Sequence, residues 1–258
     1  MAAGSSCGAN ALVDETPRDL RPSYYAARPG KWRDMWNVLH PPYTAWHLSY
    51  VVIGASLAPH IHVMRLVETL CAFFLAVGIA AHVLDELRGR PLRTEIRSST
   101  LVALAIIGLL GALGIGIYGI TQVGWVLLPF MVVGPVLVVA YNFEFFGGAL
   151  HNAATFAFAW GAFPVLTAYV AQSGRVSVGS FLAAGAAFLF SIAQRTLSMP
   201  ARLIRRRATA IGGSVTLSSG KSIALDAAAL LDPLEEALRA MSWAMVLLAT
   251  SLAIARLA

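Results

Sequence analysis

The sequence is poor in charged residues and in cysteine, and both shortages exclude classes of protein. Only 12% of the 258 residues are Asp, Glu, Lys or Arg, whereas soluble domains carry about 25%. Cys7 lies in a polar tail and Cys71 in an apolar run, so these two cysteines do not suggest a disulfide framework. A cleavable signal peptide is not expected, because residues 1–42 lack a short apolar core followed by small residues.

Long apolar runs make up most of the remaining sequence. Hydrophobic residues account for 58% of the chain, and the mean hydropathy is +0.70. The fold class expected is therefore all-α, a polytopic membrane helix bundle of about seven transmembrane helices. Each is near the ~20 residues that a bilayer requires, except that the first is short. The predicted spans are residues 44–60, 63–84, 99–120, 123–142, 150–173, 177–197 and 239–257.

The polar stretches divide the chain into four parts. Residues 1–30 are rich in Ala, Gly, Ser and Pro and are predicted to form a disordered tail, and residues 31–207 form the membrane bundle. Residues 208–238 are predicted to form a cytoplasmic β-hairpin and an amphipathic helix, and residues 239–258 the last transmembrane helix. A lone hairpin is marginal in water, so residues 212–225 are expected to lean on the bundle, covering a cavity mouth or docking a protein partner.

The distribution of positive charge predicts the orientation in the membrane. Of the 19 Lys and Arg residues, sixteen fall in the N-terminal tail, in the loop after the second span and around the loop after the sixth. Only Arg65, Arg175 and Arg256 fall on the other side. The positive-inside rule therefore places the N-terminus, and the end of the second span near His82, on the cytoplasmic side of the cytoplasmic membrane.

Polar side chains gather at the cytoplasmic ends of the predicted helices. His82, Asp85 and Glu86 end the second span, and spacings of three and four put them on adjoining parts of one helix face. Ionisable groups at this depth are costly and usually face a cavity or pair with one another, although a solvated helix end with ordinary interfacial charges is the simpler interpretation. The further members at other helix ends are His47, Asn142, Glu144, His151 and Arg195.

Over residues 40–207 the chain resembles the UbiA-type intramembrane prenyltransferases. The segments that carry the resemblance are His40-Pro41-Pro42, Ala81-His82-Val83-Leu84-Asp85, Arg90-Pro91-Leu92, Tyr141-Asn142, Gly147-Gly148 and Tyr169-Val170-Ala171-Gln172-Ser173-Gly174. The second of them stands where the family has its first Asp-rich motif. In place of the second Asp-rich motif, after the sixth helix, residues 194–199 read Gln-Arg-Thr-Leu-Ser-Met and contain no acid.

The resemblance implies an enzyme that transfers a prenyl group or processes a prenyl diphosphate. His82, Asp85 and Glu86 would be the catalytic residues, with Mg²⁺ holding the diphosphate. The side chains that would help to bind the diphosphate are Arg90, Arg93, Asn142 and Arg195.

The residue types leave two alternatives open. Mg²⁺ prefers oxygen ligands, whereas a site with several imidazoles suits Fe, Mn or Zn and would indicate an intramembrane oxidase, desaturase or hydrolase. Its ligands would come from His47, His82, Asp85, Glu86, Glu144 and His151. The second alternative is a non-catalytic protein that binds an isoprenoid or a partner. In every case the expected partners are a lipid-soluble small molecule and membrane lipids, and no nucleic acid.

Overall fold

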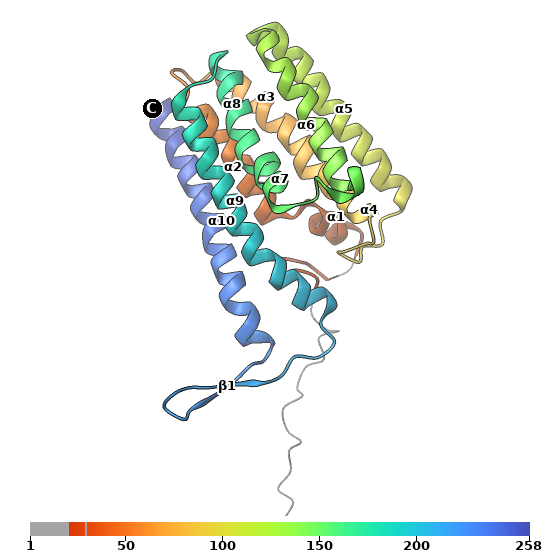
Figure 1. Ribbon diagram of the computed structural model, residues 1–258. Helices are drawn as coiled ribbons and strands as arrows, with labels where there is room; N and C mark the ends of the chain where they lie inside the picture. The colour runs from red at the N-terminus through yellow and green to blue at the C-terminus, as the bar shows by residue number, and fades with distance from the viewer. Residues whose placement is uncertain (1–20, 29) are drawn as a thin grey trace, which may run out of the picture.

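The computed structural model describes residues 21–28 and 30–258, and this part of the chain is mostly helical (Figure 1). By length and composition, 6 of its helical stretches can cross a membrane, so the chain is an integral membrane protein. These stretches are Val63–Leu87, Ser98–Val123, Trp125–Asn142, Ala153–Ser173, Val178–Arg207 and Ala227–Leu257.

Several of the six stretches consist of more than one element. The helices are α1 (Lys31–Leu39), α2 (Pro41–Ser56), α3 (Val63–Phe73), α4 (His82–Leu87), α5 (Ser98–Val123), α6 (Leu128–Asn142), α7 (Ala153–Ala157), α8 (Phe163–Ser173), α9 (Val178–Arg207) and α10 (Ala227–Leu257). The π-helical segments η2 (Phe74–Ala81) and η5 (Phe158–Ala162) join α3 to α4 and α7 to α8. The short 3₁₀ segments are η3 (Trp125–Leu127) and η4 (Phe146–Gly148).

The first predicted span, residues 44–60, corresponds to α2, which has only 16 residues and is shorter than the ~20 that a bilayer requires. Helix α2 lies inside the bundle and packs mainly against α8 and α10. A Cβ atom at Gly54 would lie 2.3 Å from the Val165 carbonyl oxygen, so only glycine permits this close approach of α2 and α8. Trp46 is fully buried and donates a hydrogen bond to the Tyr50 hydroxyl at 2.6 Å.

Most of the predicted disordered tail, residues 1–20 and residue 29, lies outside the described residues. For residues 21–28 the prediction is wrong, because they pack against the bundle. The Ala27 amide donates to Asn37 Oδ1 at 2.7 Å, and Asn37 Nδ2 donates back to the Ala27 carbonyl at 3.2 Å. These reciprocal hydrogen bonds with α1 hold the segment in place.

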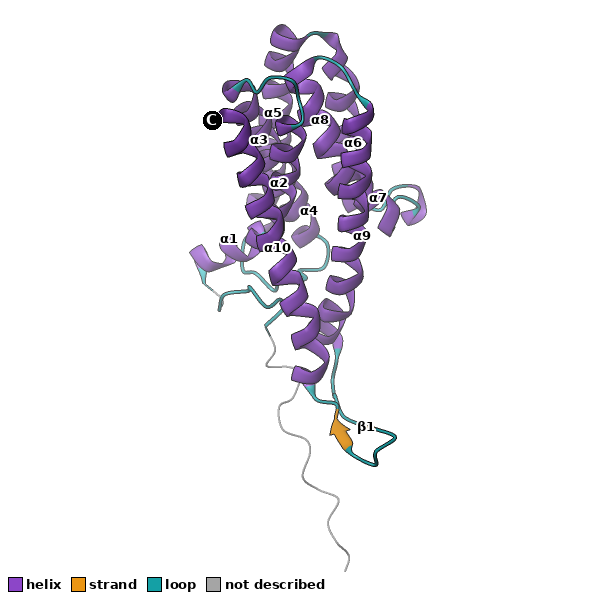
Figure 2. Ribbon diagram, turned by 90° about the vertical axis from the view of Figure 1, so that its left-hand side faces the viewer, coloured by secondary structure: helices purple, strands orange, loops and turns teal. Residues whose placement is uncertain are grey.

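The predicted hairpin exists, with β1 (Ser214–Thr216) antiparallel to β2 (Ser222–Ala224) and Val215 opposite Ile223. The expectation that it leans on the bundle is wrong. Every residue of both strands is exposed, and the hairpin projects from one end of the bundle (Figures 1 and 2). Its short strands, rich in Ser and Thr, offer too little apolar surface to pack against the helices.

The amphipathic helix predicted before the last span is the first part of α10. The Asp226 side chain caps α10 by accepting a hydrogen bond from the Ala229 amide at 2.7 Å. The helix then continues through Pro233 without interruption, so residues 227–238 and the last predicted span are one element.

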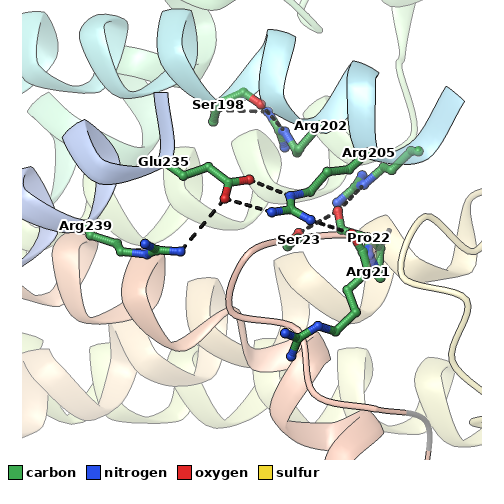
Figure 3. A network of polar contacts seen from close by, with 9 residues as sticks. Arg21, Pro22, Ser23, Ser198, Arg202, Arg205, Glu235 and Arg239 are labelled. Carbon is green, nitrogen blue, oxygen red and sulfur yellow. Dashed lines mark hydrogen bonds and ion pairs between the residues drawn. The ribbon is translucent and has the colours of Figure 1, made fainter. Parts of the chain in front are cut away.

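Arginine side chains tie the C-terminal part of α9 to α10 and to the N-terminal segment (Figure 3). Arg205 binds the buried carboxylate of Glu235 on α10 with two nitrogens, and Arg239 approaches the same carboxylate at 3.9 Å. Arg206 Nε donates to the Pro22 carbonyl at 3.2 Å. This network fixes the end of α9. Arg205 is committed to Glu235 and, unlike the arginines described below, does not line the cavity.

Candidate functional site

A cavity of about 1480 Å³ lies where α4, α6 and the C-terminal half of α9 meet. Nine of the ten residues predicted to form a site contribute to its lining, from four separate stretches of the sequence. They are His47, His82, Asp85, Arg90, Arg93, Asn142, Glu144, His151 and Arg195. The structure therefore brings the predicted helix-end cluster together around one space.

The tenth predicted residue, Glu86, does not line the cavity and is fully buried. One of its carboxylate oxygens accepts a hydrogen bond from the Leu92 amide at 3.0 Å. The other accepts from the Thr94 amide at 3.0 Å and from the Thr94 hydroxyl at 2.8 Å. Because both oxygens are used, the structure replaces the predicted catalytic and metal-binding role of Glu86 with anchorage of the loop that follows α4.

Within that loop, Arg90 is largely committed to the loop itself. Its guanidinium donates to the Thr94 and Ile96 carbonyls and to Ser98 Oγ. Arg93 makes no comparable contact in the described part of the chain. Both residues adopt left-handed backbone conformations, with φ of 53° and 57°, which the hydrogen bonds to Glu86 help to hold.

Arg88 was not among the predicted site residues, but it connects two walls of the cavity. One of its nitrogens donates to the Asn142 carbonyl at 3.2 Å, and another forms an ion pair with Glu144 at 3.0 Å. The Asn142 side chain donates back along α6, to the Val138 carbonyl at 2.8 Å. Glu144 is thus largely paired, and Asn142 offers mainly its side-chain oxygen to a ligand.

Three histidines of the cavity are oriented in the same way. Nδ1 of His47 lies 2.9 Å from the Trp160 carbonyl, Nδ1 of His82 lies 3.1 Å from the Gly78 carbonyl, and Nδ1 of His151 lies 3.1 Å from the Tyr141 carbonyl. Because a carbonyl accepts, each Nδ1 carries a proton, and in the neutral form of each ring Nε2 carries the lone pair. Trp160 and Gly78 belong to η5 and η2, and such π-helical segments often occur at functional sites.

His40 and Tyr25 were also missing from the predicted site. His40 lines the cavity, its ring centroid lies 4.5 Å from that of His82, and its Nδ1 is hydrogen-bonded to the Tyr25 hydroxyl. Burial lowers the pKa of His40 well below 6.5, and the positive potential of His82 and nearby arginines acts in the same direction. Burial raises the pKa of Tyr25 to about 12. Both groups are therefore neutral at physiological pH.

Positive charge dominates the cavity. Among the described residues, only two acids, Asp85 and Glu144, are part of the lining. The seven arginines of the lining are Arg88, Arg90, Arg93, Arg195, Arg202, Arg206 and Arg207. Arg202 and Arg206 were not predicted as site residues, although their spacing of seven and eleven from Arg195 places all three on one face of a helix.

The donor groups do not fit a metal ion held by the protein alone. No group of three His, Cys, Asp or Glu side chains in residues 21–28 and 30–258 is arranged to hold one. Glu86 is occupied by the loop and Glu144 by Arg88. Burial affects Asp85 most strongly, and the groups that act on it next are Arg202, Arg206, His151 and Arg88, none of which is an acid. The predicted divalent ion stays a prediction.

A second, apolar pocket of about 130 Å³ lies between α3, α5, α6 and α8. Its far end holds Glu68, which pairs with Gln122 through a hydrogen bond of 2.9 Å. Trp160 lines both this pocket and the polar cavity. Its indole packs against the rings of Tyr141 and Phe156, so one aromatic side chain borders a charged space and a hydrocarbon-like one.

Comparison with protein-family models, with curated proteins and with solved structures finds no match for this chain, and the resemblance to UbiA-type prenyltransferases therefore stays a prediction.

Proposed function

We propose that this chain is a membrane enzyme that acts on a phosphorylated isoprenoid or a similar amphipathic lipid, by prenyl transfer or by processing of the diphosphate. The observation that carries the proposal is the cavity of about 1480 Å³, where seven arginines surround His82 and Asp85. Guanidinium groups bind phosphate oxygens through strong charge-assisted hydrogen bonds. A cavity of this charge at the end of apolar helices suits a ligand with an anionic head and a hydrocarbon chain.

The neighbouring apolar pocket supports a ligand with a hydrocarbon chain. Because Trp160 lines both spaces, a head group in the polar cavity and a chain directed toward Trp160 would each meet a surface of matching polarity. The Lys and Arg distribution supports a cytoplasmic position for the polar end. The exposed hairpin at residues 212–225 offers a protein partner a surface on that same side.

The chemistry would proceed by rupture of the allylic carbon–oxygen bond, with pyrophosphate leaving with the bonding electron pair. The acceptor then forms a bond to the allylic carbon and gives up a proton, or water does so in a hydrolytic reaction. The arginines stabilise the negative charge that develops on the leaving group. His82, whose Nε2 carries the lone pair, and Asp85 are the candidates to receive the proton.

One observation favours the second candidate, a transition-metal oxidase, desaturase or hydrolase. His47, His82 and His151 each use Nδ1 for a backbone carbonyl, which is the arrangement that leaves Nε2 to bind a metal in many metalloproteins. Against it stands the lack of a three-ligand cluster in the described part of the chain.

The test uses the full chain reconstituted in phosphatidylcholine vesicles with radiolabelled geranyl or farnesyl diphosphate. Release of pyrophosphate, or transfer of the label to a lipid-soluble acceptor, is expected, and Asp85→Asn should remove it. Tight binding without turnover of either compound would indicate a non-catalytic isoprenoid-binding protein. No binding, together with stoichiometric Fe, Mn or Zn in the purified protein, would overturn the proposal in favour of the metal enzyme.

A further inference from the structure

One face of α9 forms an uninterrupted basic wall of the cavity. Arg195, Ser198, Arg202 and Arg206 follow one another at spacings of three and four residues, and all four line the cavity. Such spacings keep side chains on one side of a helix. No acid lies in α9, so nothing on this helix neutralises the three guanidinium groups.

The hydrogen bonds of these arginines hold them in place without using all their donors. Arg195 donates to the Tyr141 hydroxyl at 2.6 Å and lies over the Phe156 ring, 5.3 Å from its centroid. Arg202 binds the carbonyl and the hydroxyl of Ser198, both at 3.3 Å (Figure 3). Each guanidinium is therefore fixed at one end.

The remaining nitrogens lack acceptors. Within residues 21–28 and 30–258, Nε of Arg195 and Nη2 of Arg206 are buried without a hydrogen-bond partner. Buried donors are rarely left unpaired in folded proteins, and a bound anion is one explanation of such a donor. Because the missing partners of a guanidinium are acceptors, a ligand that paired with these side chains would carry acceptor oxygens.

The positive charge of the cavity also favours one kind of ligand over another. The only carboxylate of the cavity that lacks an ion pair in the described part of the chain is Asp85, and seven arginines line the same cavity. A Mg²⁺ ion needs several oxygen ligands from the protein and the substrate, and here it would enter a space that is already strongly positive. A diphosphate, with two charged groups and many acceptor oxygens, meets both requirements, and the planar guanidinium fork matches its geometry.

We infer that Arg195, Arg202 and Arg206 bind the diphosphate of the substrate directly, in the place where metal-bridging carboxylates would otherwise stand. The inference rests on the proposed function and specifies how its substrate is held. The arginine wall of α9 supplies the positive charge itself, so binding of the head group does not require a divalent ion.

The test measures binding of inorganic pyrophosphate to the full chain in phosphatidylcholine nanodiscs by equilibrium competition, in EDTA and in Mg²⁺. Binding in EDTA is expected, with less than about a threefold change when Mg²⁺ is added. Arg202→Gln and Arg206→Gln should each weaken it by about tenfold or more, as loss of a charged hydrogen bond implies. Arg202→Lys keeps the charge but not the fork and should lose less.

The matched control is Arg97→Gln. It removes the same charge at the same end of the bundle, but Arg97 is exposed and does not line the cavity, so affinity should change less than about twofold. Size-exclusion profiles and thermal unfolding show whether each variant keeps its fold. If Arg202→Gln does not fold, pyrophosphate binding by Arg206→Gln and Arg202→Lys tests the inference instead.

Three results would overturn the inference and have different consequences. Binding that is absent in EDTA, restored by Mg²⁺ and lost in Asp85→Asn would establish a metal bridge and leave the proposed function standing. Displacement of pyrophosphate by nanodiscs containing phosphatidylglycerol would identify lipid head groups as the occupants. Failure of pyrophosphate and geranyl diphosphate to bind under either condition would remove the inference and the proposed function together.

Discussion

The two walls of the polar cavity differ in chemistry. The wall made by α2 and the end of α4 holds His47, His82 and Asp85, whereas the α9 wall holds arginines and no acid. The difference indicates a division of labour, in which one wall is suited to moving a proton and the other to binding an anion.

The largest expected effect separates the two walls. Asp85→Asn and His82→Ala should each lower turnover of a prenyl diphosphate by about 100-fold or more, because they remove the groups proposed to take the proton. Binding of pyrophosphate to the α9 wall should change by less than about threefold. Turnover in vesicles and competition binding in nanodiscs measure the two quantities on the same preparations.

The control for this comparison is Glu95→Gln, which removes a negative charge from an exposed residue that does not line the cavity. Its turnover of a prenyl diphosphate and its binding of pyrophosphate should equal those of the unmodified chain. Unchanged turnover in both Asp85→Asn and His82→Ala would mean that the first wall is only structural, and the proposed division of labour would fail.

Adjacent acids on α4 provide the next contrast. Glu86→Gln should destabilise the protein by about 2 kcal/mol, because the amide nitrogen would face amide and hydroxyl donors in a buried site. Asp85→Asn should cost much less, because the Asp85 side chain faces the cavity. Thermal unfolding in detergent measures both.

Limited trypsin digestion gives an independent readout of the same contrast. The loop that Glu86 anchors contains two cleavable arginines, Arg88 and Arg93, so it should become a site of rapid cleavage in Glu86→Gln. Equal stability and equal cleavage in the two variants would contradict the anchoring role.

A smaller effect is expected in the apolar pocket. Gly134 lines the apolar pocket, and a Cβ atom there would lie 3.4 Å from the Phe163 ring. Gly134→Leu should therefore fill the pocket and weaken binding of farnesyl diphosphate about tenfold, the loss expected from roughly 1.4 kcal/mol of hydrocarbon contacts. Binding of pyrophosphate should be unchanged.

Gly114→Leu is the matched substitution, because a Cβ atom at Gly114 meets nothing within 4 Å and the residue does not line the pocket. Competition binding with pyrophosphate and with farnesyl diphosphate measures both variants. If Gly134→Leu weakened the two ligands equally, the apolar pocket would not hold the chain of the substrate.

The smallest effect concerns pH. Because the pKa of His40 is lowered in the folded protein, the unfolded chain binds a proton near pH 6.5 that the folded chain does not. Stability from this group is thus present above pH 6.5 and is lost as the pH falls, by about 1 kcal/mol between pH 6.5 and 5.5. His40→Asn, which tolerates the left-handed backbone at this position, should flatten the pH dependence of the melting temperature. An unchanged slope would contradict the burial of a neutral imidazole.

Much of the fold follows from local sequence properties. Apolar runs of the right length predicted the membrane helices, and alternation around Ser218-Ser219-Gly220-Lys221 predicted the hairpin. The predictions that failed concern features that depend on tertiary contacts. The packing of residues 21–28 against the bundle depends on contacts with distant residues such as Asn37, and no local pattern reports those.

The candidate site was predictable to a similar degree. Collecting polar residues at helix ends identified nine residues that line the cavity, because such residues avoid lipid. The approach could not distinguish Asp85 from Glu86, since a helix end alone does not show which carboxylate a later loop will cover. It also missed Arg202 and Arg206, whose charge is equally expected of an ordinary membrane-anchoring helix end.

A structure of the full chain with a non-hydrolysable thio-analogue of geranyl diphosphate, determined in EDTA, tests the arginine wall most directly. We expect diphosphate oxygens within about 3 Å of guanidinium nitrogens of Arg202 and Arg206, with the hydrocarbon chain running toward Trp160. A diphosphate that is seen only when Mg²⁺ is present, bridged by the ion to Asp85 and away from α9, would contradict it.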